Sequence, residues 1–297
     1  MQNEVFSQMG KALKRQFLPW LFLLPTVLGF IVFSWYPIVL GLIVSLQKYH
    51  PIRPPQFVGL ANFETLFSDP LFVTAWKNTV EFSLLSLLIG YLVPVVLAIL
   101  VNEVRRGKSF YRIAYYLPAV LPGVVTAVLW RWLYDPGVGL LNTVIRVFGG
   151  QGLPWLMSAD TVIPSLVFMA TWAGFGSTTV VYLAALQGVP SELYEAAEID
   201  GALVLQRLRY ITLPQIRPVM LTMLILQIIG TFQVFTEPFV MTSGGPNNAS
   251  LTILLLIYRY AFMYFDFGVA AAAGFILFVV LLLVTLTYFR VTARLEE

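Results

Sequence analysis

Residues 195–214 hold the densest set of side chains in this chain that could recognise another molecule. The stretch contains Glu195, Ala196, Ala197, Glu198, Asp200 and Gly201 and, nine residues later, Ile211, Leu213 and Pro214. The carboxylates place negative charge at one point, and the small alanines let another surface approach closely. The stretch lies between two long apolar segments, so the pattern favours a docking surface for a soluble partner.

The same sequence excludes several kinds of catalytic site. The chain has no Cys, so it has no thiolate nucleophile and no iron–sulfur cluster. Its single His50 excludes a His-based metal cluster and a Ser-His-Asp triad. Residues 106–109 read Arg-Gly-Lys-Ser, but a phosphate-binding loop needs glycine where Asn102 stands, after a strand rather than an apolar segment. We therefore expect a non-enzymatic chain with no ATPase site and no cofactor of its own.

The composition indicates what must position the 195–214 stretch. Of 297 residues, 59% are hydrophobic and only 11% are charged, against about 25% charged in a soluble domain. A segment that crosses the bilayer needs about 20 apolar residues. Six stretches qualify, at 17–46, 79–101, 113–134, 162–186, 219–240 and 268–289. The sequence predicts an all-α membrane protein with six transmembrane helices. The first is retained and is interrupted by Pro25 and Pro37, so it is either kinked or only partly embedded.

The distribution of Lys and Arg predicts the orientation of these spans. Twelve of the eighteen basic residues fall on one side of six spans and six on the other, and cytoplasmic loops carry the excess. Both termini and residues 195–214 are then cytoplasmic. We expect cytoplasmic tails at 1–16 and 291–297 around a membrane domain at 17–290. The domain core spans about 78–290 and its cytoplasmic loop about 187–217.

Within the cytoplasmic loop, the sequence predicts two short helices. The first starts at Ser191, whose hydroxyl can cap it, has Glu192 in its first turn, and runs to about Asp200. Gly201 then allows a sharp turn, because a positive φ costs glycine little.

The second predicted helix carries an apolar stripe. Val204, Leu208 and Ile211 recur at the spacing of one helical face. We expect Pro214 to end this helix and Pro218 to open the next span.

The span centres hold no carboxylate, His or Lys, which are the usual marks of ion-coupled transport. Glu81, Arg131 and Glu237 fall near span ends. The energy source for any transport is therefore expected outside the spans.

Neutral polar and aromatic side chains do occur within two spans. They allow two interpretations: contacts between helices, or the lining of a cavity for an uncharged, hydroxyl-rich solute on which aromatic rings stack. The candidates in the fourth span are Thr171, Trp172, Ser177, Thr178 and Thr179, and those in the fifth are Gln227, Thr231, Phe232, Gln233, Phe235 and Thr236.

Residues 195–214 resemble the signature loop of permease subunits of ABC-type importers. That loop reads Glu-Ala-Ala, three residues, Gly, nine residues, Ile-x-Leu-Pro, and the spacing here matches it without gaps. Three further segments, 57–63, Asn78-Thr79 and 244–250, resemble the carbohydrate branch of the family. Together they extend the resemblance over nearly the whole chain and indicate a maltose- or lactose-type permease, without the large external insertion of the maltose-type member.

The resemblance implies a heteromeric importer in the bacterial inner membrane. This chain would pair with a second, different permease, two copies of a cytoplasmic ATPase that bind ATP and Mg²⁺, and an external solute-binding protein. It would contact membrane lipid and no nucleic acid. Residues 195–214 would couple it to the ATPase, with Glu195 and Asp200 facing basic side chains there.

Several alternatives stay open at this point. The expected solute is a sugar, a di- or oligosaccharide, and the alternatives are a polyol, glycerol phosphate, an amino acid or another small solute. An anionic solute would need an Arg or Lys in the cavity to bind it, and the span centres contain neither. Outside the family, the alternatives are an ion-coupled secondary transporter, a channel, or a membrane enzyme.

Overall fold

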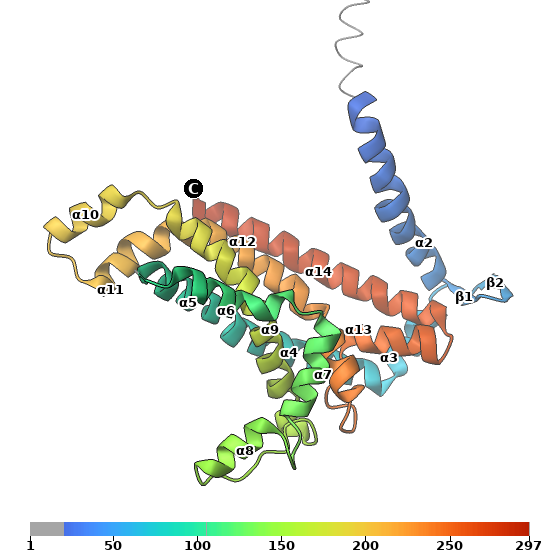
Figure 1. Ribbon diagram of the computed structural model, residues 1–297. Coiled ribbons are helices and arrows are strands. Elements are labelled where there is room, and N and C mark those ends of the chain that lie inside the picture. The colour runs from blue at the N-terminus through green and yellow to red at the C-terminus, as the bar shows by residue number, and fades with distance from the viewer. Residues whose placement is uncertain (1–20, 105, 297) are drawn as a thin grey trace, which may run out of the picture.

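The computed structural model of the chain describes residues 21–104 and 106–296 (Figure 1). The predicted tail at 1–16 and residues 17–20 of the first span lie outside this part. Residues 21–30 are helical. The elements that follow are η1 (Ile31–Trp35), α2 (Tyr36–Ser45), β1 (Gln47–His50), β2 (Arg53–Phe57), α3 (Ala61–Ser68), α4 (Pro70–Gly90), α5 (Leu92–Glu103), α6 (Lys108–Val120), α7 (Gly123–Leu133), α8 (Leu140–Val147), α9 (Ala159–Gln187), α10 (Ser191–Ile199), α11 (Val204–Arg207), η2 (Leu208–Thr212), α12 (Leu213–Phe232), η3 (Pro238–Thr242), α13 (Ile253–Tyr258), η4 (Arg259–Met263) and α14 (Phe267–Glu296).

The architecture is a bundle of long apolar helices, with one antiparallel β-hairpin, β1–β2, as the exception to an all-α chain. Five helical stretches in the described residues are long and apolar enough to cross a membrane: Leu21–Ser45, Pro70–Glu103, Ala159–Gln187, Val204–Phe232 and Phe267–Arg294. The predicted C-terminal tail continues α14 instead of leaving the helix. The number of spans is six if the bent pair of α6 and α7 crosses the membrane as one span.

The third predicted span is broken rather than continuous. The helices Ile113–Val120 and Gly123–Leu133 meet at an angle of 106°. Pro118 lies inside α6, where it removes a helical hydrogen bond, and Pro122 forces Leu121 into an extended conformation. The two prolines therefore explain why one apolar stretch gives two helices.

The first span contains a local π-helical segment, η1, before Pro37. Proline has no N–H to donate, and the Tyr36 N–H bonds to the carbonyl of Ile31 five residues back. The helix is continuous from Leu21 to Ser45, with this irregularity at the second proline. Leu21–Ser45 has no buried residue over its apolar window and projects from the bundle in Figure 1.

The centre of the bundle is α9, which packs on α4, α5, α6 and α12. Gly176 makes the contact with α6 possible, because a Cβ there would lie 2.1 Å from the carbonyl oxygen of Tyr115. On another side of α9, Val95, Tyr182 and Ile216 form a buried cluster that joins α5, α9 and α12. The N-terminal part of α12, which leads into the fifth predicted span, thus packs against α5 and α9.

Polar side chains join the loops at the end of the bundle opposite α10 and α11 (Figure 1). Asn78 donates to the carbonyls of Asn248 and Leu251 at 2.8 and 3.0 Å, and Thr79 accepts from the Ile253 N–H at 2.9 Å. Arg259 donates to Asn248 Oδ1 at 2.9 Å. Two segments far apart in sequence, 78–79 and 244–250, are therefore one structural unit.

Candidate functional site

Helix α10 is the exposed helix at the tip of the molecule. It begins at Ser191 with Pro190 as its N-cap residue, and no side chain caps it. The predicted capping by Ser191 is therefore wrong. Pro190, with its extended ψ, takes the N-cap position, and Ser191 is already the first residue of the helix. Glu192 does lie in the first turn, where a carboxylate is favoured by the exposed N–H groups.

Gly201 ends α10 with a positive φ of 75°. The Ala202 N–H donates to the Ala197 carbonyl at 2.8 Å, and the Gly201 N–H donates to the Glu198 carbonyl at 3.0 Å. These two bonds form a Schellman motif, which satisfies the last carbonyls of the helix. The predicted turn at Gly201 is confirmed, and it reverses the chain into α11.

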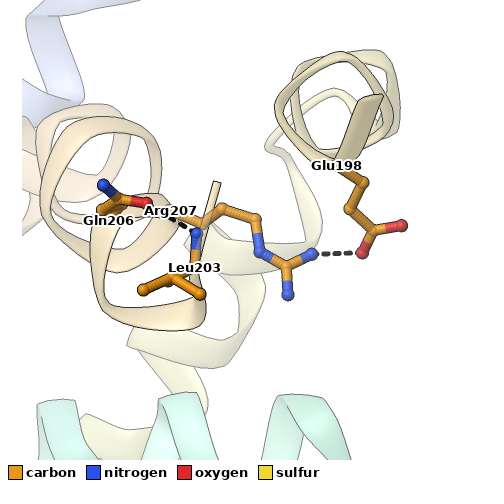
Figure 2. A network of polar contacts seen from close by, with 4 residues as sticks. All are labelled: Glu198, Leu203, Gln206 and Arg207. Atoms are coloured by element: carbon orange, nitrogen blue, oxygen red, sulfur yellow. Dashed lines mark hydrogen bonds and ion pairs between the residues drawn. The ribbon is translucent and has the colours of Figure 1, made fainter. Parts of the chain in front are cut away.

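Two side-chain contacts hold α10 against the segment that follows it. Arg207 forms an ion pair with Glu198, shown in Figure 2. The Tyr194 hydroxyl bonds to Thr212 Oγ1 at 3.0 Å. Nearby, Gln206 Oε1 accepts from the Leu203 N–H at 2.7 Å (Figure 2). The hairpin of α10, α11 and η2, residues 191–212, is thus internally tied, and Glu198 already has a partner within it.

The outer face of this hairpin is open. Glu195, Ala196 and Asp200 are exposed, and neither carboxylate forms an ion pair with a side chain that the structure describes. Apolar side chains surround them, with Ile199 87% exposed and Leu205 74% exposed. An exposed apolar surface beside unpaired carboxylates is typical of a protein interface.

Pro214 does not end the second helix, contrary to the prediction. Val204–Phe232 is one helical rod of 29 residues. A π-helical turn, η2, precedes Pro214, and the Leu213 N–H bonds to the carbonyl of Leu208. Such a turn absorbs the missing proline N–H without breaking the helix. Pro218 likewise lies inside α12 and does not open a span.

The inner residues of the signature pattern anchor the rod. Leu213 packs against the buried cluster around Val95 and Ile216, and Ile211 is half-buried. Val204, the first residue of the predicted apolar stripe, is 72% exposed. The stripe therefore passes from solvent into the bundle along one helix.

The far end of the rod opens into a cavity of about 600 Å³ between α4, α9 and α12. Eight of the predicted polar or aromatic residues line it: Thr171, Ser177, Thr178, Gln227, Thr231, Gln233, Phe235 and Thr236. Gln227 Nε2 donates to the Ser86 carbonyl at 2.7 Å, so one of its amide hydrogens serves a contact between helices. These polar residues thus include both a contact between helices and the lining of a cavity.

Three other candidates lie elsewhere. Trp172 packs edge-on against Trp130, with ring centroids 5.4 Å apart, in the core between α7 and α9. Phe232 packs beside Trp76. Thr179 is fully buried and donates to the Phe175 carbonyl at 2.7 Å. These side chains support the cavity walls and do not line them.

The cavity wall includes Glu237, which the sequence placed at the edge of a span. Helix α12 ends at Phe232, and residues 233–235 form a non-helical break before the next helical turn. Irregular backbone at membrane depth is tolerated where it lines a cavity or is buried in protein. The break places Gln233, Thr236 and Glu237 on the wall. Pro238 was the sequence signal that the predicted span could not run straight to residue 240.

Gly90 is a second wall residue that the sequence analysis missed. A Cβ at this position would lie 3.1 Å from both Gln227 Nε2 and Thr171 Oγ1. The glycine therefore lets three helices bring two polar side chains close together. No group of three potential metal-binding side chains occurs among the residues that the structure describes.

Comparisons with known proteins give a consistent result. Residues 90–297 match the family described as "Binding-protein-dependent transport system inner membrane component". The arabinooligosaccharides transport permease AraP of Bacillus subtilis is 34% identical over 94% of this chain and 89% of AraP. The sn-glycerol-3-phosphate transport permease UgpA of Escherichia coli is 34% identical over 93% of this chain and 94% of UgpA.

A solved structure extends the match to three dimensions. A chain of a bacterial ABC transporter involved in importing the acidic polysaccharide alginate aligns with a TM-score of 0.86 and 29% identity. The alignment covers 98% of the present chain and all of the other. The same kind of transporter has been solved in complex with a periplasmic protein that holds an alginate pentasaccharide.

Proposed function

This chain belongs to the family of inner-membrane components of binding-protein-dependent transport systems, and from that premise we propose that it is one permease subunit of an ATP-driven sugar importer. It forms half of the translocation pathway for a neutral di- or oligosaccharide. The observation that carries the proposal is the single rod Val204–Phe232, which joins an exposed hairpin to a polar cavity.

Energy enters through the hairpin of residues 191–212. A cytoplasmic ATPase subunit, two copies per transporter, binds ATP and Mg²⁺ and receives α10 in a cleft. Glu195 and Asp200 meet basic side chains there, while Ala196 and Ala197 permit close approach. The unpaired carboxylates and the exposed apolar rim of the hairpin support this contact. Glu198 has a different role, because it holds Arg207 within the hairpin.

This assignment requires the hairpin and both termini to be cytoplasmic. The excess of Lys and Arg on that side of the spans supports it. Six crossings also place both termini on one side. Figure 1 shows α6 beginning at the end of the bundle that carries α11, while α7 leads toward α8, which supports counting the broken pair as one crossing.

The remaining partners are a second, different permease and an external solute-binding protein. The helix Leu21–Ser45 packs against α14 through α2 but leaves most of its apolar side chains exposed, so lipid or the second permease covers them. The periplasmic protein bound to the structurally similar alginate transporter supports a binding protein here. The transporter lies in the bacterial inner membrane.

The cavity supports a sugar as the solute. Its side chains are mainly hydroxyls and amides, which exchange hydrogen bonds with sugar hydroxyls, and Phe235 offers an aromatic ring. AraP supports an oligosaccharide. UgpA is the observation in favour of a second candidate, glycerol phosphate, although no Lys or Arg lines the cavity among the described residues.

The test is uptake by the reconstituted complex of both permeases and the ATPase in vesicles with ATP inside, with loaded binding protein outside. We expect sugar uptake that requires ATP and survives collapse of the proton and sodium gradients. Uptake that needs an ion gradient and no ATP would instead identify a secondary transporter.

A further inference from the structure

Glu237 is the only charged side chain among the described residues that line the cavity between α4, α9 and α12. An ionisable group at membrane depth is costly and usually has a functional partner. No Lys or Arg lies within ion-pair distance of its carboxylate among the side chains that the structure describes. Glu237 is half-buried, so its charge has neither a protein counter-ion nor full hydration.

The neighbours of Glu237 on the cavity wall are neutral. The break after α12 also contributes Gln233 and Thr236, and α9 contributes Ser177 and Thr178. These side chains can both donate and accept hydrogen bonds. An ionised carboxylate can only accept, so in that form Glu237 selects for a solute that brings donors to this point.

Sugar hydroxyls are such donors, and a hydrogen bond to a charged acceptor is stronger than one to a neutral acceptor. A solute carboxylate or phosphate at the same point would place two negative charges close together in a partly buried space. The repulsion is larger there than in water because the effective dielectric constant is lower.

We propose that Glu237 is a specificity-determining residue of the pathway, which accepts hydrogen bonds from the hydroxyls of a neutral oligosaccharide and rejects solutes bearing a carboxylate or a phosphate. This inference rests on the proposed function. It predicts that this chain rejects anionic solutes of the kind printed for one relative and one structural neighbour, namely glycerol 3-phosphate and alginate.

The experiment compares two probes in the reconstituted complex. The neutral probe is arabinotriose or maltotriose, whichever gives the faster ATP-dependent uptake. The anionic probe is the same trisaccharide with one primary hydroxyl oxidised to a carboxylate. The ratio of anionic to neutral uptake is measured for wild type and for Glu237→Gln. The same binding protein serves both complexes, so its own preference cancels when the two ratios are compared.

We expect Glu237→Gln to slow neutral uptake about tenfold and to raise the anionic-to-neutral ratio at least tenfold. The matched control is Glu81→Gln, the same chemical change at a carboxylate in the separate cavity beside α4 and α9. The control should leave the ratio unchanged.

Two results would overturn the inference. One is an unchanged ratio in Glu237→Gln. The other is loss of the second permease on co-purification of Glu237→Gln, which would show that the carboxylate pairs with a cation of that subunit. A wild-type complex without ATP-dependent uptake would refute the proposed function instead, so the two failures are distinguishable.

Discussion

The hairpin of residues 191–212 and the cavity around Glu237 are built in opposite ways. The hairpin is exposed, highly charged and held by a few contacts within itself, chiefly Glu198 with Arg207 and Tyr194 with Thr212. The cavity lies between three packed helices and is open on one side, and all but one of its polar side chains are neutral. We therefore expect the hairpin to meet a rigid protein surface and the cavity to hold a small solute.

The substitution that should separate the two regions most strongly is Gly201→Val. Valine at a φ of 75° is strained by about 1–3 kcal/mol, which would reorient α10. We expect transport per ATP hydrolysed to fall at least tenfold while the protein still inserts. The measurement is sugar uptake and phosphate release in the same vesicles.

Gly149→Val is the matched control for that substitution. Gly149 has a φ of 80° and open space around its Cα, but it lies after α8, far from the hairpin in sequence. The control should retain normal transport per ATP. Equal losses in both variants would mean that the strain acts on folding and not on coupling.

A smaller effect is expected in the cavity from Gly90→Ala. The added methyl group meets Gln227 and Thr171 at 3.1 Å, so these side chains must shift by a few tenths of an ångström. We expect a several-fold lower maximal rate of uptake with unchanged ATP hydrolysed per sugar. Gly174→Ala is the control, because Gly174 lines the same cavity and has open space. A change in sugar transported per ATP would contradict the separation of the two regions.

The smallest effect concerns the ion pair in Figure 2. Exposed pairs contribute about 0.2–1 kcal/mol, so Arg207→Glu alone should reduce stimulated ATP hydrolysis no more than about fivefold. The charge-swapped double variant with Glu198→Arg and Arg207→Glu should recover most of that loss. Absence of recovery would show that Glu198 or Arg207 contacts the ATPase directly and does not merely orient α10.

Local chemistry was enough to predict the hairpin. The start near Ser191 and the turn at Gly201 follow from short-range preferences, and the structure has both. The prediction that Pro214 ends the helix was wrong because a π-helical turn accommodates this proline and the helix continues. No sequence pattern distinguishes that case from a helix end.

The cavity was predictable only in part. The polar residues of the fourth and fifth spans were visible, but which of them face inward depends on helix rotation. Trp172 and Phe232 therefore could not be told apart from Phe235. Glu237 reaches the wall because the chain breaks after Phe232. Pro238 signalled an interruption of the span but not the residue at which the helix ends.

The rod Val204–Phe232 is held near its middle. Ile216 is buried between α5 and α9, and the Tyr91 hydroxyl donates to the Met220 carbonyl at 2.9 Å. At about 1.5 Å per residue, roughly 20 Å of helix extends on each side of this point. We expect a rigid tilt of the rod about this point to move the hairpin and the cavity wall in opposite directions. Closing one face of the membrane domain would then open the other.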